Sequence, residues 1–228
     1  MDSEKWLARI RRQRSDGMKI LALSDEVVDF IYSPQVKERF GGVDFVVGCG
    51  DLPYYYLEFV VTILNKPLLF VPGNHDANNQ YVSDGRILNH AEGCVNLDGA
   101  MRGECGLLLA GLGGSIRYRP DGVHQYTQNE MKARAAALAP ALWLNRLKHG
   151  RFLDILITHS PPLGIHDGGD LAHTGFVAFL SFAQRFRPRF ILHGHSHVYR
   201  RTDVTHTRIG ATEVLNVYPY RLIEWEEG

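Results

Sequence analysis

Pro67-Leu68-Leu69-Phe70-Val71-Pro72-Gly73-Asn74-His75-Asp76 is an apolar run that opens directly into a polar cluster. A short, continuous apolar run of this kind is typical of a strand buried on both faces. In open α/β sheets, the residues that follow the carboxyl ends of the strands gather at one edge and bind ligands there. The stretch therefore predicts a buried strand that delivers Asn74, His75 and Asp76 to a binding edge.

Four further apolar runs are each followed by a residue able to bind a cation. The runs are 18–23, 44–47, 152–157 and 189–192, and the residues that follow them are Asp25, Asp51, His159 and the pair His195 and His197. Helices are expected over 34–40, 53–64, 128–149 with an interruption near Pro140, and 174–186. Short strands are expected at 94–97, 106–111 and within 198–225. Strands that alternate with helices in this way predict an α/β fold.

The composition is that of a globular protein. Hydrophobic residues make up 45% and charged residues 22% of the 228 residues, and a chain of this size can bury one continuous core. We predict an N-terminal helical extension at 1–17 and a single domain at 18–228. The 25 basic and 25 acidic residues cancel, so there is no overall field to attract nucleic acid or an anionic membrane.

Three cysteines, Cys49, Cys94 and Cys105, are too few and too irregularly spaced for a disulfide framework or a thiolate zinc site. The first residues contain no apolar segment of signal-peptide length, and no run of about 18 apolar residues occurs. We therefore expect a cytoplasmic protein with no membrane partner.

The residues at the strand ends form one chemical set of carboxylates, a carboxamide and imidazoles, without a thiolate. Such a set favours Mn²⁺, Fe or Zn²⁺ in a reactive centre over a structural zinc. A pair of metal ions needs a bridging group. Asp51 is the candidate, because a carboxylate has two oxygens and Gly50 lets the backbone approach closely.

Taken together and in order, these motifs resemble the calcineurin-like metallophosphoesterase superfamily. The matching motifs are Gly50-Asp51, Gly73-Asn74-His75-Asp76, His159 and Gly194-His195-Ser196-His197. The resemblance implies a four-layer αββα sandwich, with two mixed β-sheets flanked by helices. It also implies a hydrolase of phosphoesters in which two divalent cations activate a hydroxide for attack on phosphorus.

The resemblance implies a role for each matched residue. One metal site would take Asp51, Asn74, His159 and His195; the other would take Asp25, Asp51 and His197, with Asp51 bridging the two cations. His75 would stabilise charge on the phosphate or protonate the leaving oxygen, with Asp76 as its orienting partner.

The first motif departs from the family pattern, because Val27 occupies the place of a histidine ligand. The first site would then be weaker, vacant, differently coordinated, or completed by water, Glu26 or Asp29. Val27 also motivates an alternative function, a binding or scaffold protein that keeps the fold with impaired catalysis. The presence of His75 and of the other ligands argues against that alternative.

The substrate class has weaker signals. The segment 158–167 is similar to a branch of the superfamily that includes small phosphodiesterases, which favours phosphodiesters over phosphomonoesters. Arg117, Asp167 and His173 are candidate substrate contacts, and loop solvation or helix capping is the alternative for the last two. The loop that contains Arg117, Tyr118, Arg119, His124 and Tyr126 could bind a nucleotide base and phosphate or be an ordinary surface loop.

A third function, a nuclease, is supported only by Arg200-Arg201 and the N-terminal arginines, which more often form solvated faces. The expected partner is therefore a small phosphorylated molecule, with a nucleotide as one candidate.

Overall fold

The first of two large β-sheets is built mainly from the N-terminal half of the chain. The computed structural model describes residues 17–77, 79–81, 85 and 87–226, so all of the predicted N-terminal extension except Gly17 lies outside the described residues. This sheet has the order β15-β1-β2-β3-β6. Its strands are β1 (Met18–Leu23), β2 (Phe45–Gly48), β3 (Leu68–Phe70), β6 (Val95–Asn96) and β15 (Tyr220–Trp225).

The second sheet has the order β13-β14-β12-β11-β8-β7. Its strands are β7 (Met101–Glu104), β8 (Leu107–Leu112), β11 (Ile155–Thr158), β12 (Phe190–His193), β13 (His206–Ile209) and β14 (Thr212–Asn216). Both sheets are mixed, because β15 runs antiparallel to β1 while β7 and β13 run antiparallel to β8 and β14. Two small pairs complete the strands: β4 (Gln80–Tyr81) with β5 (Ile87–Leu88), and β9 (Ser115–Ile116) with β10 (Gln125–Tyr126).

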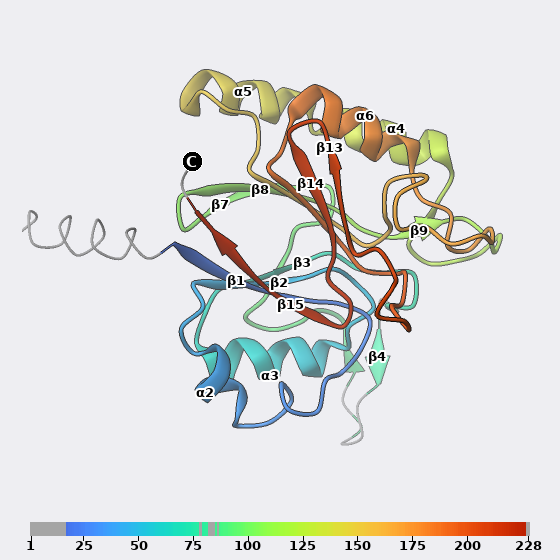
Figure 1. Ribbon diagram of the computed structural model, residues 1–228. Coiled ribbons are helices and arrows are strands. Elements are labelled where there is room, and N and C mark those ends of the chain that lie inside the picture. Colours follow the sequence, from blue (N-terminus) through green and yellow to red (C-terminus); the bar gives the residue numbers. More distant parts are fainter. Residues whose placement is uncertain (1–16, 78, 82–84, 86, 227–228) are drawn as a thin grey trace, which may run out of the picture.

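Helices cover the outer face of each sheet, so the chain forms a four-layer αββα sandwich (Figure 1). The helices α2 (Val36–Phe40) and α3 (Tyr54–Leu64) cover the first sheet. The helices α4 (Gln128–Ala137), α5 (Ala139–His149) and α6 (Val177–Phe186) lie over the second. The predicted fold class is confirmed.

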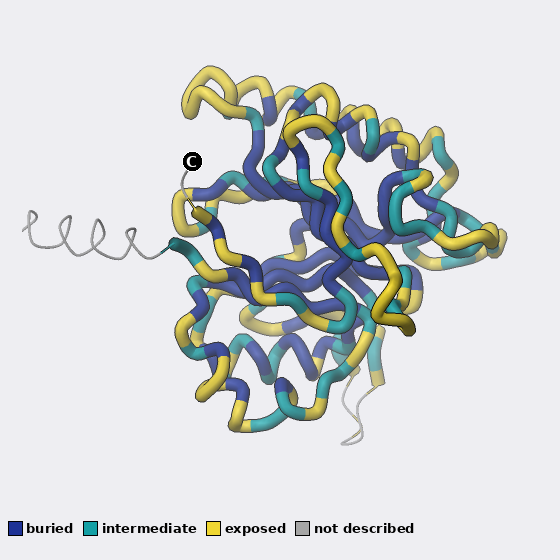
Figure 2. The backbone as a smooth tube through the Cα atoms, in the orientation of Figure 1, coloured by how far each residue is buried: buried dark blue, intermediate teal, exposed yellow. Residues whose placement is uncertain are grey.

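The alternation of side chains along each strand builds the layers. In β1, Ile20 and Ala22 face the core between the sheets, whereas Leu21 and Leu23 face the layer of α2 and α3. Since both faces of the central strands β2, β3 and β11 are buried, these strands are almost entirely apolar, and Figure 2 shows buried backbone running through the middle of the molecule. This explains why continuous apolar runs located the strands in the sequence.

The predicted helix at 128–149 is two helices that meet at Leu138, close to the expected interruption at Pro140. A capping box of Thr127 and Glu130 begins α4. The predicted helix at 174–186 begins later, at Val177, because Phe176 is extended and its N–H donates to the carbonyl of Pro161. No helix in the described part of the chain combines the length and apolar character needed to cross a lipid bilayer.

Candidate metal centre

The carboxyl ends of the central strands lie level with one another. In the first sheet Leu23 pairs with Gly48, and Gly48 pairs with Phe70, so β1, β2 and β3 end together. In the second sheet β11 and β12 run parallel in the same way. The loops after these strands carry the predicted ligands, and the ligands of the two sheets meet: both carboxylate oxygens of Asp25 accept from the backbone N–H of His195, at 3.1 and 2.9 Å.

Three predicted ligands adopt left-handed backbone conformations. The φ angles of Asp25, Asp51 and His195 are 64°, 55° and 64°, in a region that non-glycine residues seldom occupy. Strain of this kind, of order 1–3 kcal/mol per residue, concentrates at functional sites. Glycines make room for the turns, since a Cβ atom at Gly73 would overlap the Asp51 carboxylate and one at Gly194 would overlap Asp25.

Two histidines are oriented by backbone carbonyl groups. The Nδ1 atom of His159 lies 2.8 Å from the carbonyl oxygen of Cys49, and the Nε2 atom of His195 lies 2.8 Å from that of Ala172. Because a carbonyl oxygen only accepts, each of these ring nitrogens carries the hydrogen. The opposite nitrogens, Nε2 of His159 and Nδ1 of His195, then carry lone pairs in the neutral rings. Hydrogen bonding of the second ring nitrogen to a carbonyl is the usual arrangement of metal-binding histidines.

The lone-pair nitrogens converge with oxygen donors. The Nε2 atom of His159 lies 3.1 Å from Nδ1 of His195, 3.0 Å from Oδ1 of Asn74 and 3.4 Å from Oδ2 of Asp51. Donor atoms that each lie about 2.1 Å from one cation are about 3.0 Å apart in octahedral and about 3.4 Å apart in tetrahedral coordination. The four side chains predicted for one metal site therefore fit a divalent cation in both chemistry and spacing.

The electrostatics also favour a positive charge at this point. Burial alone would lower the pKa of His159, but the carboxylates of Asp51 and Asp25 outweigh it and raise that pKa to about 9. Burial alone would raise the pKa of Asp51, yet His159 holds it well below its usual range. Burial and the charge of His159 lower the pKa of His195 to about 4. The carboxylates thus create a negative potential that a bound cation would neutralise.

The second predicted metal site is less complete. The Oδ1 atom of Asp25 lies 3.7 Å from Nε2 of His197, and the His197 ring stacks on Tyr218 with centroids 4.5 Å apart. Val27 packs against the apolar cluster beneath α2 and α3. The carboxylate of Glu26, a predicted substitute ligand, accepts a hydrogen bond of 2.7 Å from the Tyr218 hydroxyl. Among the described residues, the tight group of potential metal ligands is Asp51, His159 and His195.

The sequence matches the model of one known protein family. The family model of the calcineurin-like phosphoesterases matches residues 18–199. The chain belongs to the calcineurin-like phosphoesterase family. Membership implies divalent metal ions and hydrolysis of phosphoesters, which the convergence of Asp51, His159 and His195 supports.

Solved structures show the same fold. One crystal structure has a TM-score of 0.60 and 15% sequence identity, covering 91% of this chain and 95% of the other. The protein TT1561 of Thermus thermophilus has a TM-score of 0.58 and 20% identity, covering 88% of this chain and 89% of its own. A search of the curated proteins gives no match. At these identities the likeness establishes the architecture alone.

The predicted catalytic pair of this phosphoesterase lies in the loop after β3. The backbone N–H of His75 donates to Oδ1 of Asp51 at 2.8 Å, so residue 75 adjoins the ligand group and is itself exposed. The carboxylate of Asp76 is buried and accepts from the backbone N–H groups of Asp51 and Gly73 at 2.9 and 2.8 Å. Asp76 thus joins the loops after β2 and β3. Burial and the charge of Asp51 raise its pKa to about 7.

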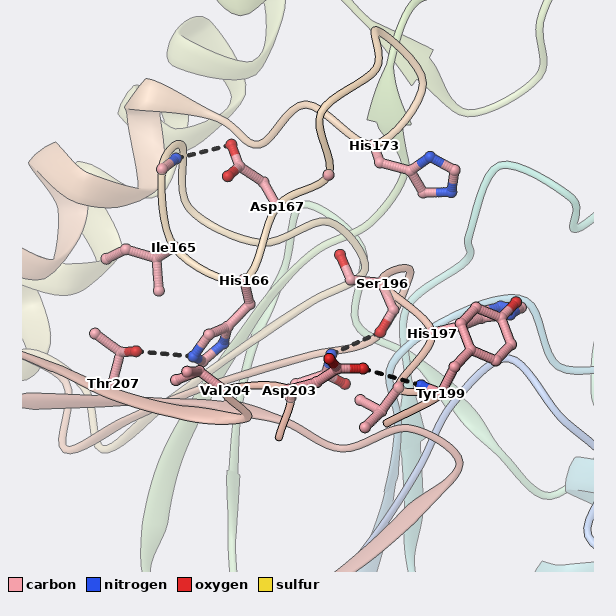
Figure 3. A pocket seen from close by; sticks show the side chains of 14 residues that line it. Ile165, His166, Asp167, His173, Ser196, His197, Tyr199, Asp203, Val204 and Thr207 are labelled. Carbon is pink, nitrogen blue, oxygen red and sulfur yellow. Dashed lines mark hydrogen bonds between the residues drawn. The ribbon is translucent and has the colours of Figure 1, made fainter. Parts of the chain in front are cut away.

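The three predicted substrate contacts have different surroundings. The guanidinium of Arg117 forms an ion pair with Glu130 at 2.9 Å. Asp167 accepts from the backbone of Gly164 at 2.7 Å and shapes its own loop. His173 lies over the ligand group, with its ring centroid 5.1 Å from that of His195. His173 and His197 also line a hollow of about 720 Å³ (Figure 3).

Two groups in contact with ligands were not predicted from the sequence. Ala172 acts through its backbone carbonyl, which carries no sequence signal. The hydroxyl of Tyr118 accepts from Nδ2 of Asn74 at 3.1 Å and turns Oδ1 of that amide towards His159. Tyr118 belongs to the polar and aromatic loop that was a candidate for nucleotide binding, so the sequence suggested that it lies near the site. Nothing in the sequence indicated that its hydroxyl contacts Asn74.

Proposed function

We propose that this chain is a hydrolase that cleaves phosphodiesters in preference to phosphomonoesters. The observation that carries the hydrolase assignment is the convergence of two histidine lone pairs with the oxygens of Asp51 and Asn74. This donor set would hold one divalent cation, and Asp25 and His197 would contribute to a second, weaker site with Asp51 shared. When bound, divalent cations of the Mn²⁺, Fe or Zn²⁺ type would supply Lewis acidity and an activated water for attack on phosphorus.

The side chains around the ligand group would complete the reaction. His75 is exposed at its edge and would donate a proton to the leaving oxygen. Asp76 would act through the backbone, since it holds the loops of Asp51 and His75 in register. No covalent intermediate with the protein is required.

The preference for diesters is supported by space on two sides of the ligand residues. One hollow of about 580 Å³ is lined by Asn74 and His75, and the hollow of about 720 Å³ is lined by His197 and His173. A diester carries two organic groups, which need two places, whereas a monoester carries one. The similarity of 158–167 to a branch with small phosphodiesterases points the same way.

The second candidate is a binding or scaffold protein, which Val27 favours because its side chain packs against the apolar cluster and cannot bind a metal. One experiment separates the two. Protein loaded with Mn²⁺ is assayed on bis-p-nitrophenyl phosphate and p-nitrophenyl phosphate, and we expect hydrolysis of both with a higher kcat/KM for the diester. Failure to hydrolyse either ester with Mn²⁺, Fe²⁺ or Zn²⁺ would support the scaffold, and a higher kcat/KM for the monoester would remove the diester preference.

A further inference from the structure

The hollow beside His75 contains an arginine that no motif assigns. Its walls come from the loop after β3 and from the loop between β9 and β10. The residues that matter here are Asn74, His75, Tyr118, Arg119 and Gln125. On the proposed function, which this inference extends, His75 donates to the leaving oxygen, so this hollow receives the leaving group.

A buried glutamine fixes the wall of this hollow. Gln125 is 4% exposed, and its Oε1 atom accepts from the backbone N–H groups of Tyr118 and Arg119 at 3.2 and 3.0 Å. A buried amide that satisfies two consecutive backbone donors holds that turn in one conformation. Tyr118 and Arg119 are therefore held at defined positions.

Tyr118 links this wall to the metal ligands. Its hydroxyl accepts from Asn74, and the guanidinium of Arg119 lies over its ring, 5.5 Å from the centroid. Arg119 therefore stands beside a residue that touches a ligand, and it shares the hollow with His75.

The two arginines of this loop differ in their partners. Arg117 is paired with Glu130 on α4. Within the described part of the chain, Arg119 forms no ion pair, although Asp121 lines the same hollow. The N–H groups of the Arg119 guanidinium can therefore donate to a ligand. Their forked geometry suits the two oxygens of a carboxylate or phosphate.

We propose that Arg119 recognises a second anionic group, a phosphate or a carboxylate, on the leaving group of the substrate. The scissile phosphate would lie at the ligand group, with its leaving oxygen at His75. The second anion would reach Arg119 in the same hollow. Phosphoesters whose leaving group carries a second negative charge would then be better substrates than those without one.

Binding of phosphonates, which cannot be hydrolysed, tests this directly. The full chain loaded with Mn²⁺ is titrated calorimetrically with phenylphosphonate, 4-carboxyphenylphosphonate and benzene-1,4-diphosphonate. The last two compounds carry a second anionic group. We expect them to bind about tenfold more tightly than phenylphosphonate, because that group would form charge-assisted hydrogen bonds with Arg119. The tighter of the two identifies the second group as carboxylate or phosphate.

Variants separate Arg119 from general effects of charge. Arg119→Ala should abolish the preference while leaving the affinity for phenylphosphonate and the Tm unchanged, and Arg119→Lys should retain part of it. Arg201→Ala, an exposed arginine outside both hollows, should keep the full preference. If phenylphosphonate binds but the preference is absent, or survives in Arg119→Ala, this inference fails and the proposed function stands. If none of the phosphonates binds although the nitrophenyl esters are hydrolysed, this inference alone fails; if neither ester is hydrolysed, both fail.

Discussion

The Nδ1 atom of His195 lies 3.1 Å from the Nε2 atom of His159, and each nitrogen faces the other with its lone pair when the rings are neutral. Their opposite nitrogens are bound to the carbonyls of Ala172 and Cys49. Two lone pairs at this distance repel unless a cation lies between them, and the same point is bordered by Asp51 and Asn74. A proton on one of the two nitrogens, or a metal ion bound by both, would remove this repulsion.

Metal binding should accordingly stabilise the fold. At a free Mn²⁺ concentration 100 times the Kd, binding contributes about 2.7 kcal/mol, which raises the Tm of a chain of this size by roughly 5–10 °C. His195→Ala should remove most of this rise in differential scanning fluorimetry, because it deletes a ligand. His149→Ala, at the exposed end of α5, is the control and should keep it. An undiminished rise in His195→Ala would contradict the assignment.

His75→Ala should lower kcat by about 10²–10⁴, the usual contribution of a general acid. The metal content should not change, since the contact with Asp51 is made by the backbone of residue 75. A proton donor matters more for a basic leaving oxygen, so the loss should be larger for phenyl phosphate than for p-nitrophenyl phosphate. Equal losses on the two esters would mean that His75 only binds the phosphate. His90→Ala, an exposed histidine outside both hollows, serves as control.

Val27→His should strengthen the weaker metal site beside Asp25 and His197. We expect the Kd of the second metal ion to fall by about tenfold or more, the scale on which single groups around a metal change its affinity. Elemental analysis and calorimetric titration with Mn²⁺ give the stoichiometry and both constants. Val28→His places a histidine on a neighbouring residue that packs against the same apolar cluster and should leave the Kd unchanged. Two equally tight metal ions in the unmodified protein would show that another group already compensates.

Tyr118→Phe should weaken metal binding by roughly tenfold. The variant removes the hydroxyl that accepts from Nδ2 of Asn74, so nothing at that position holds Oδ1 of the amide towards His159. Calorimetric titration with Mn²⁺ measures the change. Tyr81→Phe, on an exposed tyrosine of β4, is the matched control. A Kd identical to that of the unmodified protein would show that Asn74 is oriented by other contacts.

Stability should fall with acid because of two hydrogen-bonded histidines, His166 and His193. Thr207 donates to Nε2 of His166 at 2.8 Å (Figure 3). Nδ1 of His166 donates to Nε2 of His193 at 2.9 Å, since the other ring nitrogen of His193 donates to the carbonyl of Gly194. Burial, together with the charges of His206 and Arg221, lowers the pKa of His166 to about 4. A depressed histidine pKa gives a contribution that is present above about pH 6.5 and is lost as the pH falls through about 4, because only the unfolded chain takes up the proton readily.

Urea unfolding at several pH values from 4 to 6.5 measures this dependence. His166→Gln should have a smaller slope of unfolding free energy against pH than the unmodified protein. His149→Gln, on an exposed histidine, should retain the original slope. An unchanged slope in His166→Gln would contradict the assignment of this group.

The sequence by itself located the buried central strands and the residues that follow them, but not the short pairs β4–β5 and β9–β10 or the edge strand β7. Continuous apolar runs such as 67–71 are typical of strands buried on both faces, and polar residues that follow parallel strands gather at the carboxyl edge of the sheet. The α/β class, the ligand candidates and the departure at Val27 were therefore readable from local pattern and motif order. The break near Pro140 was readable too, because proline disrupts the interior of a helix but fits its first turn, where Pro140 lies in α5.

The tertiary structure decided everything that depends on contacts between distant residues. The carbonyl of Ala172 orients His195, Tyr118 turns the amide of Asn74, and Asp76 binds the backbone of Asp51. The same loop carries Arg117 and Arg119, yet only the fold pairs the first with Glu130 and places the second in the hollow beside His75. Periodicity reports which face of an element is buried, but a hydrogen bond between segments tens of residues apart is set by the packing of both sheets.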